Sequence, residues 1–296
     1  MIRLEGVSKR FGTIEALAPL DLEIRDGEWL GVFGRNGSGK TSLLRILVGL
    51  SQPSSGRVLL HDTVPTPEDW RQLRRSLGFM PERISLFENL TGERTLHYFA
   101  KLKGVAATEV APLLERVGLT HAARRRLAGY SKGMLQRLNL AQALLGSPRL
   151  IVVDEPIEGL DAHGVQDFFD MLRSVEGRTV VFSSHRLPQV SRFVDRICVL
   201  SQGKVAALGT EDELHGALNL PVRIIVRPSV ASNGHLAAAF ARYDFASVTH
   251  LDGRLVVQVP QRKKLRFLAG LEALEASIDD VRIEEPSLEE VLLETT

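Results

Sequence analysis

The chain has 296 residues, of which 44% are hydrophobic and 25% charged, a composition typical of a globular protein with one large domain and a smaller one. Its 37 basic and 36 acidic residues are well mixed and leave a formal net charge of +1, which argues against a nucleic-acid-binding face. The single cysteine, Cys198, lies in an apolar run that predicts a buried strand, and no window reaches the ~18 apolar residues of a membrane span. We therefore expect a cytoplasmic protein without internal disulfides, whose membrane work requires a partner.

Short alternating segments at residues 1–8, 20–25 and 57–60 predict an antiparallel β layer near the amino terminus. From residue 28 the pattern changes. EWLGVF is typical of a short apolar strand, and GRNGSGKTSLLRILVGL predicts a glycine-rich loop that leads into an amphipathic helix ending near Gly49.

The middle of the chain changes from helical to strand patterns. Residues 84–147 have helical period and length, which predicts a helical insert. LIVVDEP (150–156) and TVVFSSH (179–185) are short apolar runs typical of strands buried on both faces, and a helix from about 164 to 175 is expected between them. We predict an α/β domain with a parallel core sheet.

A new alternating pattern begins at Pro221. Its expected strands are VRIIVRP, RLVVQVP and DDVRIEEP, and a helix is expected near residues 262–273. We interpret residues 221–296 as a small α+β domain with an accessory or regulatory role, after a first domain at residues 1–220.

The loop GRNGSGKT fits the pattern G-x-x-x-x-G-K-[ST] between a strand and a helix. Glycines in this pattern let backbone N–H groups curl round phosphates at a helix N-terminus. Lys40 is expected to reach the β and γ phosphates of ATP, and the Thr41 hydroxyl to meet Mg²⁺. The residues of this loop expected to contact the nucleotide are Gly34, Arg35, Asn36, Gly37, Ser38, Gly39, Lys40, Thr41 and Ser42.

Four other side chains are candidates for the same site. Asp154 and Glu155 end the strand LIVVDEP, where adjacent carboxylates are expensive to bury without a cation or a reacting water. Asp154 is predicted to hold Mg²⁺ and Glu155 to polarise the water that attacks the γ-phosphate, the alternative being a pair of solvated strand-end acids. His185 could touch the γ-phosphate or this water, although a lone histidine is usually structural. Phe11 could stack on adenine or simply pack.

Together with YSKGM (130–134), these segments resemble the ATP-binding subunits of ABC transporters. GRNGSGKT matches Walker A, YSKGM the signature, LIVVDEP Walker B, EGLD with Asp161 the D-loop, and SSH the switch histidine, all in the family's order within residues 1–215. The resemblance implies an α/β P-loop NTPase fold with an antiparallel β subdomain and a helical subdomain, ATP hydrolysis, and Mg²⁺. It also implies a homodimer in which Ser131 and Gly133 contact the nucleotide of the facing subunit.

The chain departs from the family pattern at two positions. Lys132 replaces the first of two adjacent signature glycines, while Ser131 and Gly133 remain. Glu82 stands where the family has a glutamine that links nucleotide to the membrane subunit, and its carboxylate is expected near Mg²⁺. The aromatics Phe87, Tyr98 and Phe99 follow, and they are predicted to receive a coupling helix of a dimeric transmembrane subunit or, alternatively, to belong to the core.

Within the family, the chain resembles the ATPase subunits of the Nos transporters, which serve maturation of the copper enzyme nitrous oxide reductase. The similarity rests on ENLTGERTLHYFAKLKG, YSKGMLQRLNLAQALLGSPRL, LPVRI and EEPSLEEV. It implies a position on the cytoplasmic face of the inner membrane and a periplasmic partner beyond the membrane subunit. Scattered histidines and the absence of C-x-x-C predict that other subunits touch the metal.

Other functions remain open. The closing motif EEPSLEEV is shared with drug and sodium exporters of the same branch, so an exporter ATPase for another cargo is the first alternative. A soluble ABC ATPase acting on nucleic acid or ribosomes would carry a long coiled coil or two cassettes in tandem, and neither is seen. A P-loop kinase or switch GTPase would lack the signature and the switch histidine.

Overall fold

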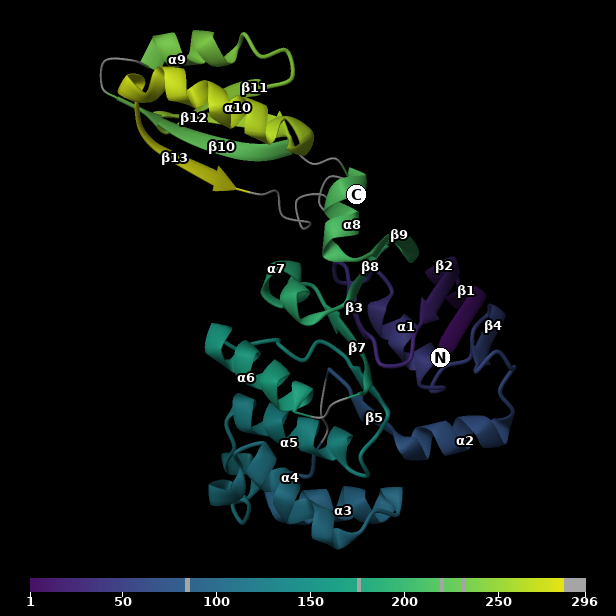
Figure 1. Ribbon diagram of the computed structural model, residues 1–296. Coiled ribbons are helices and arrows are strands. Elements are labelled where there is room, and N and C mark those ends of the chain that lie inside the picture. The colour runs from purple at the N-terminus through teal and green to yellow at the C-terminus, as the bar shows by residue number, and fades with distance from the viewer. Residues whose placement is uncertain (83–85, 175–176, 219–220, 230–232, 285–296) are drawn as a thin grey trace. The chain divides into compact units, whose positions relative to one another are not determined.

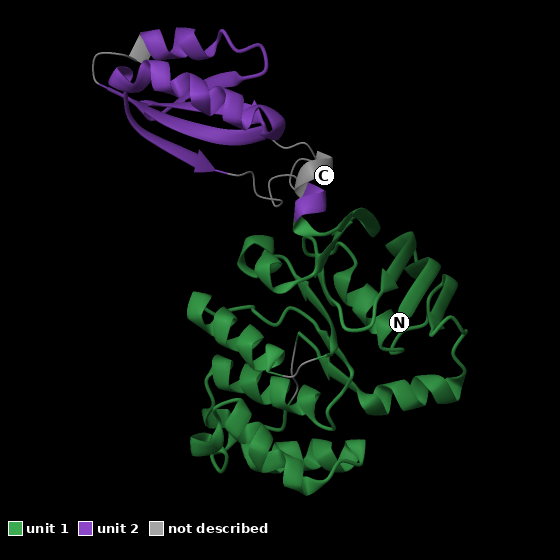
Figure 2. Cartoon of the chain, viewed as in Figure 1, with its two compact units in different colours: residues 1–211 green, residues 212–296 purple. Residues whose placement is uncertain are grey.

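The computed structural model describes residues 1–82, 86–174, 177–218, 221–229 and 233–284. The chain divides into two compact units, residues 1–211 and residues 212–296 (Figure 2). The division falls at the start of helix α8 (Glu211–Leu218), whereas the sequence places the start of the second domain at Pro221. No helix within the described ranges is long and apolar enough to cross a membrane.

The first unit contains a three-stranded antiparallel sheet, as the alternating segments predict. Its strands have the order β2-β1-β4 (Figure 1). They are β1 (Ile2–Phe11), β2 (Ile14–Ile24) and β4 (Ser55–Leu60). Strands β1 and β2 are longer than the sequence pattern indicates. Bulges shift the register between them, and the pairing continues as far as the hairpin turn.

The core of the first unit is a six-stranded sheet with the order β5-β6-β7-β3-β8-β9. Its strands are β3 (Trp29–Phe33), β5 (Leu77–Met80), β6 (Leu150–Val153), β7 (Thr179–Ser184), β8 (Arg196–Ser201) and β9 (Lys204–Gly209). All neighbouring pairs are parallel except β8 and β9, which confirms the predicted parallel core. Strands β6, β7 and β3 lie side by side, so the segments that follow them meet at one edge of the sheet.

Helices lie around this sheet, and those between residues 92 and 144 form the expected helical insert. The helices are α1 (Lys40–Leu47), α2 (Pro67–Ser76), α3 (Gly92–Lys103), α4 (Val110–Arg116), α5 (Lys132–Leu144), α6 (Ala162–Arg173) and α7 (Leu187–Val190). Polar caps fix where several of them begin. Thr66 and Asp69 form a reciprocal capping box at α2, and Thr91 caps α3.

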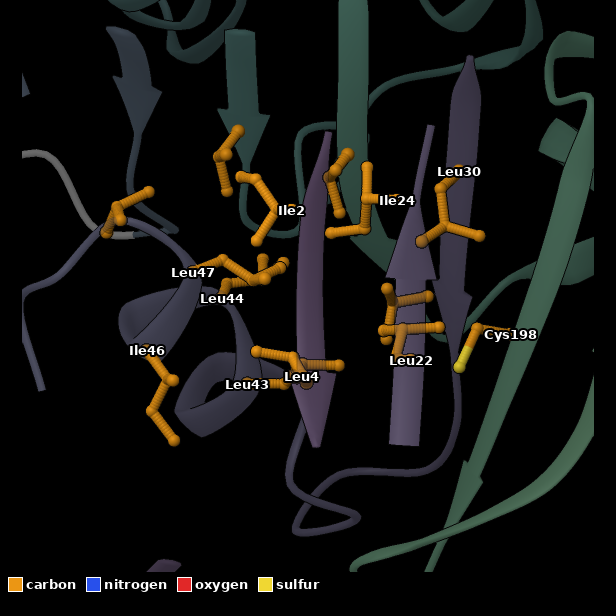
Figure 3. Packing of buried hydrophobic residues seen from close by; sticks show 14 of the residues in the cluster. Ile2, Leu4, Leu22, Ile24, Leu30, Leu43, Leu44, Ile46, Leu47 and Cys198 are labelled. Atoms are coloured by element: carbon orange, nitrogen blue, oxygen red, sulfur yellow. The ribbon is translucent and has the colours of Figure 1, made fainter. Parts of the chain in front are cut away.

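Helix α1 is anchored by its apolar face. Leu43, Leu44 and Leu47 are buried and point toward Leu4 on β1 (Figure 3). Cys198 on β8 belongs to the same cluster, as its apolar context predicts, and burial raises the pKa of its thiol to about 12. Because the helix cannot rotate without exposing these side chains, the loop that precedes it is held in place.

Lys103, the last residue of α3, joins the helical insert to the core sheet. Its ammonium donates to the carbonyls of Leu77, Gln142, Ala143 and Leu145 at distances of 3.2, 3.5, 3.4 and 3.2 Å. The ammonium therefore satisfies carbonyls at the start of β5 and at the carboxyl end of α5, a position that the helix dipole favours for a cation.

Burial lowers the pKa of Lys103 from 10.5 to about 8, with Glu109 opposing the shift. Between these two pH values the unfolded chain keeps a proton that the folded chain has lost, so Lys103 makes the unfolding free energy rise with pH. We expect Lys103→Met to remove this rise. The difference in unfolding free energy between wild type and variant, measured by urea denaturation, should grow by about 2 kcal/mol from pH 8 to pH 10.

Cys198 acts in the opposite direction above pH 9, since its folded-state pKa is about 12 against 9.0 for the free thiol. Both chains contain Cys198, so its contribution cancels in the difference between them. A difference that does not change with pH would show that Lys103 keeps its proton throughout.

After α8, the described residues of the second unit form a four-stranded antiparallel sheet with the order β11-β12-β10-β13, accompanied by helices α9 and α10, in agreement with the α+β pattern. Its elements are β10 (Pro221–Pro228), α9 (Asn233–Phe240), β11 (Ser247–Leu251), β12 (Arg254–Pro260), α10 (Lys264–Leu271) and β13 (Ile278–Glu284). Alternate residues of β10 and β12 pack with Phe240 and Phe267 of the helices in one core. The segment EEPSLEEV lies, apart from Glu284, outside the described residues.

Candidate active site

The glycine-rich loop follows β3 and ends at the first residue of α1. Gly39 caps the helix with φ 106°, a backbone conformation that residues with a side chain rarely adopt. A Cβ at this position would lie 2.5 Å from the Ala16 carbonyl oxygen and 2.6 Å from the Leu17 side chain. Glycine is therefore required by both conformation and space, and the loop brings its backbone N–H groups to the N-terminus of α1.

Lys40 lies on the inner side of this loop and is 6% exposed. Its Nζ donates to the carbonyls of Gly34 at 2.7 Å and Arg35 at 3.2 Å. The same ammonium forms an ion pair at 3.2 Å with Oε1 of Glu155, which is 9% exposed. The structure thus brings together a lysine and a carboxylate that are 115 positions apart in the sequence.

Asp154 and Glu155 follow β6 and are both buried, so they are not the solvated strand-end acids of the alternative interpretation. The Asp154 backbone N–H donates to the Met80 carbonyl at 2.8 Å. Ser183 connects the two acids: its hydroxyl donates to Asp154 Oδ1 at 2.6 Å and accepts from the Glu155 backbone N–H at 2.9 Å. Ser183 lies two residues before His185, and no motif in the sequence predicts its role.

The conformation of Glu155 turns its side chain toward the loop. Its φ of 46° is in the left-handed region, which is uncommon for a residue with a side chain and is typical of functional sites. Oε2 lies 2.9 Å from Nδ1 of His185. An ionised carboxylate only accepts hydrogen bonds, so Nδ1 carries a proton and Nε2 faces away from Glu155.

These side chains line a cavity of about 400 Å³. The size is that of a small-molecule site. The lining residues are Phe11, Ala16, Asn36, Gly37, Gly39, Lys40, Thr41, Ser42, Glu82, Glu155, Glu158 and His185. Phe11 is 52% exposed and stands at this cavity, so its ring is available to a flat ligand and is not part of the core.

Seven of the predicted residues do not line this cavity. Gly34, Arg35 and Ser38 belong to the glycine-rich loop and Asp154 follows β6, whereas Ser131, Gly133 and Asp161 lie in other segments. Ser131 is exposed and caps α5, where its hydroxyl accepts from the Met134 backbone N–H at 3.3 Å. Gly133 follows in the first turn, and apart from its chain neighbours and the backbone of its own helix no atom would come within 4 Å of a Cβ there. Asp161 caps α6 and accepts from the Gly164 N–H at 2.8 Å. Ser131 and Gly133 of the signature therefore do not line the cavity beside the glycine-rich loop of their own chain.

The donor groups suit a cation that arrives with a nucleotide. No group of three or more His, Cys, Asp or Glu residues in the described ranges could hold a metal by itself. Mg²⁺ is commonly held by one or two protein oxygens together with water and substrate phosphates, and Asp154 and Thr41 can supply such oxygens next to the loop. Glu82 lines the same cavity and adds a third oxygen donor.

The sequence is similar to those of known proteins over its full length. The family model described as ABC transporter matches residues 17–158. YdbJ of Bacillus subtilis (strain 168), an uncharacterized ABC transporter ATP-binding protein, is 31% identical over 304 residues that cover 100% of this chain and 95% of YdbJ. Daunorubicin resistance ATP-binding protein DrrA3 of Streptomyces coeruleorubidus is 34% identical over 308 residues, covering 100% of this chain and 95% of DrrA3.

Two further similarities bear on function. Nod factor export ATP-binding protein I of Burkholderia orbicola (strain AU 1054) is 32% identical over 289 residues, covering 95% of each chain. Among solved structures, the dimeric structure of MJ0796, a bacterial ABC transporter cassette, has a TM-score of 0.66 and 26% identity, covering 71% of this chain and 98% of MJ0796.

Proposed function

We propose that this chain, which belongs to the ABC transporter family and is an ATP hydrolase coupled to transport, binds MgATP between two copies of itself and drives a separate membrane subunit. The observation that carries the proposal is the position of Glu155. Its carboxylate is buried between the ammonium of Lys40 and the imidazole of His185, beside the glycine-rich loop.

The geometry supports a direct role for Glu155 in hydrolysis. The water oxygen forms a bond to the γ-phosphorus, the bond between that phosphorus and the bridging oxygen of ADP breaks, and Glu155 takes the water proton. His185 donates from Nδ1 to Oε2 and keeps the carboxylate oriented, while its Nε2 is free to face the γ-phosphate. The phosphates compete with Glu155 for the Lys40 ammonium, so nucleotide binding releases the carboxylate to act as a base.

Asp154, Thr41 and Glu82 would hold Mg²⁺ together with the phosphates. The cation supplies charge neutralisation on the β and γ oxygens when it is bound. Two hydrogen bonds hold Asp154 in place for this role. The Ser183 hydroxyl donates to its Oδ1, and its backbone N–H donates to the Met80 carbonyl. Phe11 is proposed to stack on adenine.

The exposed signature supports a composite site between two chains. Ser131, Gly133 and the N-terminus of α5 lie outside the chain's own cavity, with nothing packed around Gly133. In a two-fold symmetric pair, the signature of one chain would face the glycine-rich loop of the other, with Asp161 of the D-loop near the same interface. Lys132 would then add a cation beside the partner's nucleotide.

Nucleotide-driven dimerisation tests this proposal. We expect Glu155→Gln to be a monomer without nucleotide and a dimer with MgATP, because the variant keeps the site's shape but cannot complete hydrolysis. Sedimentation equilibrium with and without MgATP measures the change. The control is Glu155→Gln combined with Lys40→Ala, which should stay monomeric. A single variant that stays monomeric at saturating MgATP would contradict the composite site.

An exposed aromatic cluster supports docking to a membrane subunit. Phe87 and Tyr98 are 60% and 45% exposed, and their ring centroids lie 6.2 Å apart. The ring centroids of Phe99 and Tyr98 lie 5.6 Å apart, and Leu102 on the next turn of α3 is also exposed. This surface begins five residues after Glu82, which lines the nucleotide cavity, so the same segment can report the state of the site to a coupling helix.

Two observations favour two different cargoes. Relatives of similar length are named for drug resistance and Nod factor export, which favours an exporter ATPase on the cytoplasmic face of the inner membrane. The segments YSKGMLQRLNLAQALLGSPRL and LPVRI favour the Nos transporters with their periplasmic partner and copper-related role. Genes for nitrous oxide reductase beside this one would decide for the second, and genes for antibiotic synthesis for the first. Either role leaves residues 221–296 as an accessory domain.

A further inference from the structure

We propose that Gln136 is a positioning residue for Glu155 of its own chain. The inference rests on the proposed function, in which Glu155 is the base and the first turn of α5 faces the nucleotide of a second chain. Helix α5 would then serve two ATP sites: its N-terminus contacts the partner's nucleotide, and a side chain one turn later holds the catalytic segment of its own site.

The contacts of Gln136 are specific to this segment. The side chain lies in the second turn of α5 and is 8% exposed. Its Nε2 donates to the Pro156 carbonyl at 2.9 Å and to the Glu158 carbonyl at 3.2 Å. Both N–H groups of the amide are therefore used on the segment that follows Glu155. Gln136 and Glu155 also line a second cavity together, next to Lys132.

Glu155 needs such support because neither a strand nor a helix holds it. Strand β6 ends at Val153 and α6 begins at Ala162, and Glu155 itself has the unfavourable φ of 46°. Before the carboxylate, Ser183 holds the chain through the Glu155 N–H. After it, the hydrogen bonds from Gln136 are the second anchor. Removing one anchor lets the backbone relax and moves the carboxylate away from the attacking water.

A purely structural role explains Gln136 less well. Its Oε1 is buried and has no hydrogen-bond partner among the described residues. A buried acceptor without a partner carries a desolvation cost, which a methionine of similar length would avoid. The amide's donor end is what the fold uses, and it is used only on the segment after Glu155.

The same helix provides a matched control. Gln142 lies two turns further along α5, and its Nε2 donates to the Phe79 carbonyl at 2.7 Å and to Asn139 Oδ1 at 3.0 Å. Gln142 thus also bonds a backbone carbonyl of a neighbouring segment, but that segment is β5 and not the one that carries Glu155. Gln142→Met removes a partly buried amide from α5 while leaving the Pro156 and Glu158 carbonyls bonded.

The experiment compares steady-state phosphate release of the full-length chain. Gln136→Met is expected to lower kcat at least tenfold with KM for ATP within about threefold, because ground-state binding of the nucleotide uses the glycine-rich loop and not this segment. Gln142→Met should keep kcat within about threefold. In the Glu155→Gln background, Gln136→Met should leave MgATP-dependent dimerisation unchanged.

Gln136→Glu gives a second readout that a loss of packing would not reproduce. A carboxyl buried against two carbonyls favours its protonated form, and its O–H can donate to one of them. The ratio of its kcat to that of wild type should therefore rise as the pH is lowered from 8 to 6, whereas the ratio for Gln136→Met should stay flat. This variant also decides the question if thermal melting shows Gln136→Met to be unfolded.

Three results would overturn the inference. The first is a kcat of folded Gln136→Met within threefold of wild type, and the second is a fall in its kcat matched by an equal loss of MgATP-dependent dimerisation. The third is a ratio of Gln136→Glu kcat to wild-type kcat that does not change with pH. The second result would mean that Gln136→Met lowers kcat by weakening the contact between the signature and the other chain. A failure of the proposed function itself would look different. In that case the wild-type chain would not hydrolyse ATP, and the Glu155→Gln variant would not dimerise with MgATP.

Discussion

Glu155→Gln is expected to lower phosphate release at saturating ATP by about 100-fold or more while ATP remains bound, because a positioned general base contributes that much to the rate. The amide has nearly the same shape as the carboxylate, so it keeps the turn at residue 155. It cannot accept a proton from water. Its contacts with Lys40 and His185 lose their charge, which leaves the phosphate-binding lysine unaffected or freer to bind nucleotide.

Phosphate release and the binding of a fluorescent ATP analogue measure the two halves of this expectation. Glu158→Gln is the matched control, since Glu158 lines the same cavity three residues later and is exposed. We expect its turnover to stay within about twofold of wild type. If Glu155→Gln retained more than about a tenth of wild-type turnover, Glu155 would not be the base, and His185 would be the next candidate.

Local patterns in the sequence were sufficient for much of the fold and the site. The apolar runs before residues 34, 154 and 185 predict three short apolar strands. In the structure, the parallel strands β3, β7 and β6 are neighbours in the sheet. The segments after them must then meet at one edge. That topology is why Lys40, Glu155 and His185 come together as expected, although each candidate is ambiguous when taken alone.

Other elements gave weaker signals. The periodicity of the sequence does not predict helix α2 (Pro67–Ser76), because this helix is short and strongly charged. Its only signal is the capping pattern in Thr66-Pro67-Glu68-Asp69. Strand β5 (Leu77–Met80) has only four residues, fewer than periodicity can resolve. Hydrophobic periodicity therefore does not predict such short elements, even where a helix cap is clear in the sequence.

Contacts between distant segments could not be predicted. Ser183, Gln136 and Lys103 act through backbone carbonyls, N–H groups and a carboxylate of other elements, and no spacing in the sequence encodes such a contact. The aromatics were ambiguous for a related reason. Phe87 and Tyr98 have the composition of a core, and only their exposure favours a docking surface.

A mixed dimer tests whether the signature works in its own chain or across the interface. One chain carries Lys40→Ala and the other Ser131→Arg, both in the Glu155→Gln background that prevents turnover. In the trans arrangement both lesions fall in one site, because each ATP lies between Lys40 of one chain and Ser131 of the other. The second site keeps an intact Lys40 and an intact Ser131, so we expect about one occluded ATP per dimer.

In a cis arrangement each site would contain one lesion, and the mixed dimer would hold no ATP. The two homodimers are the controls: Lys40→Ala lacks the phosphate-binding lysine, and Ser131→Arg places a guanidinium at the γ-phosphate position, so neither should occlude nucleotide, whereas Glu155→Gln alone should hold two. Differently tagged chains, tandem purification and counting of bound radiolabelled ATP give the ratio. The structure favours the trans result, because Lys40 lines its own chain's cavity and Ser131 is exposed outside it. A mixed dimer that forms but holds no ATP would rule out the composite site.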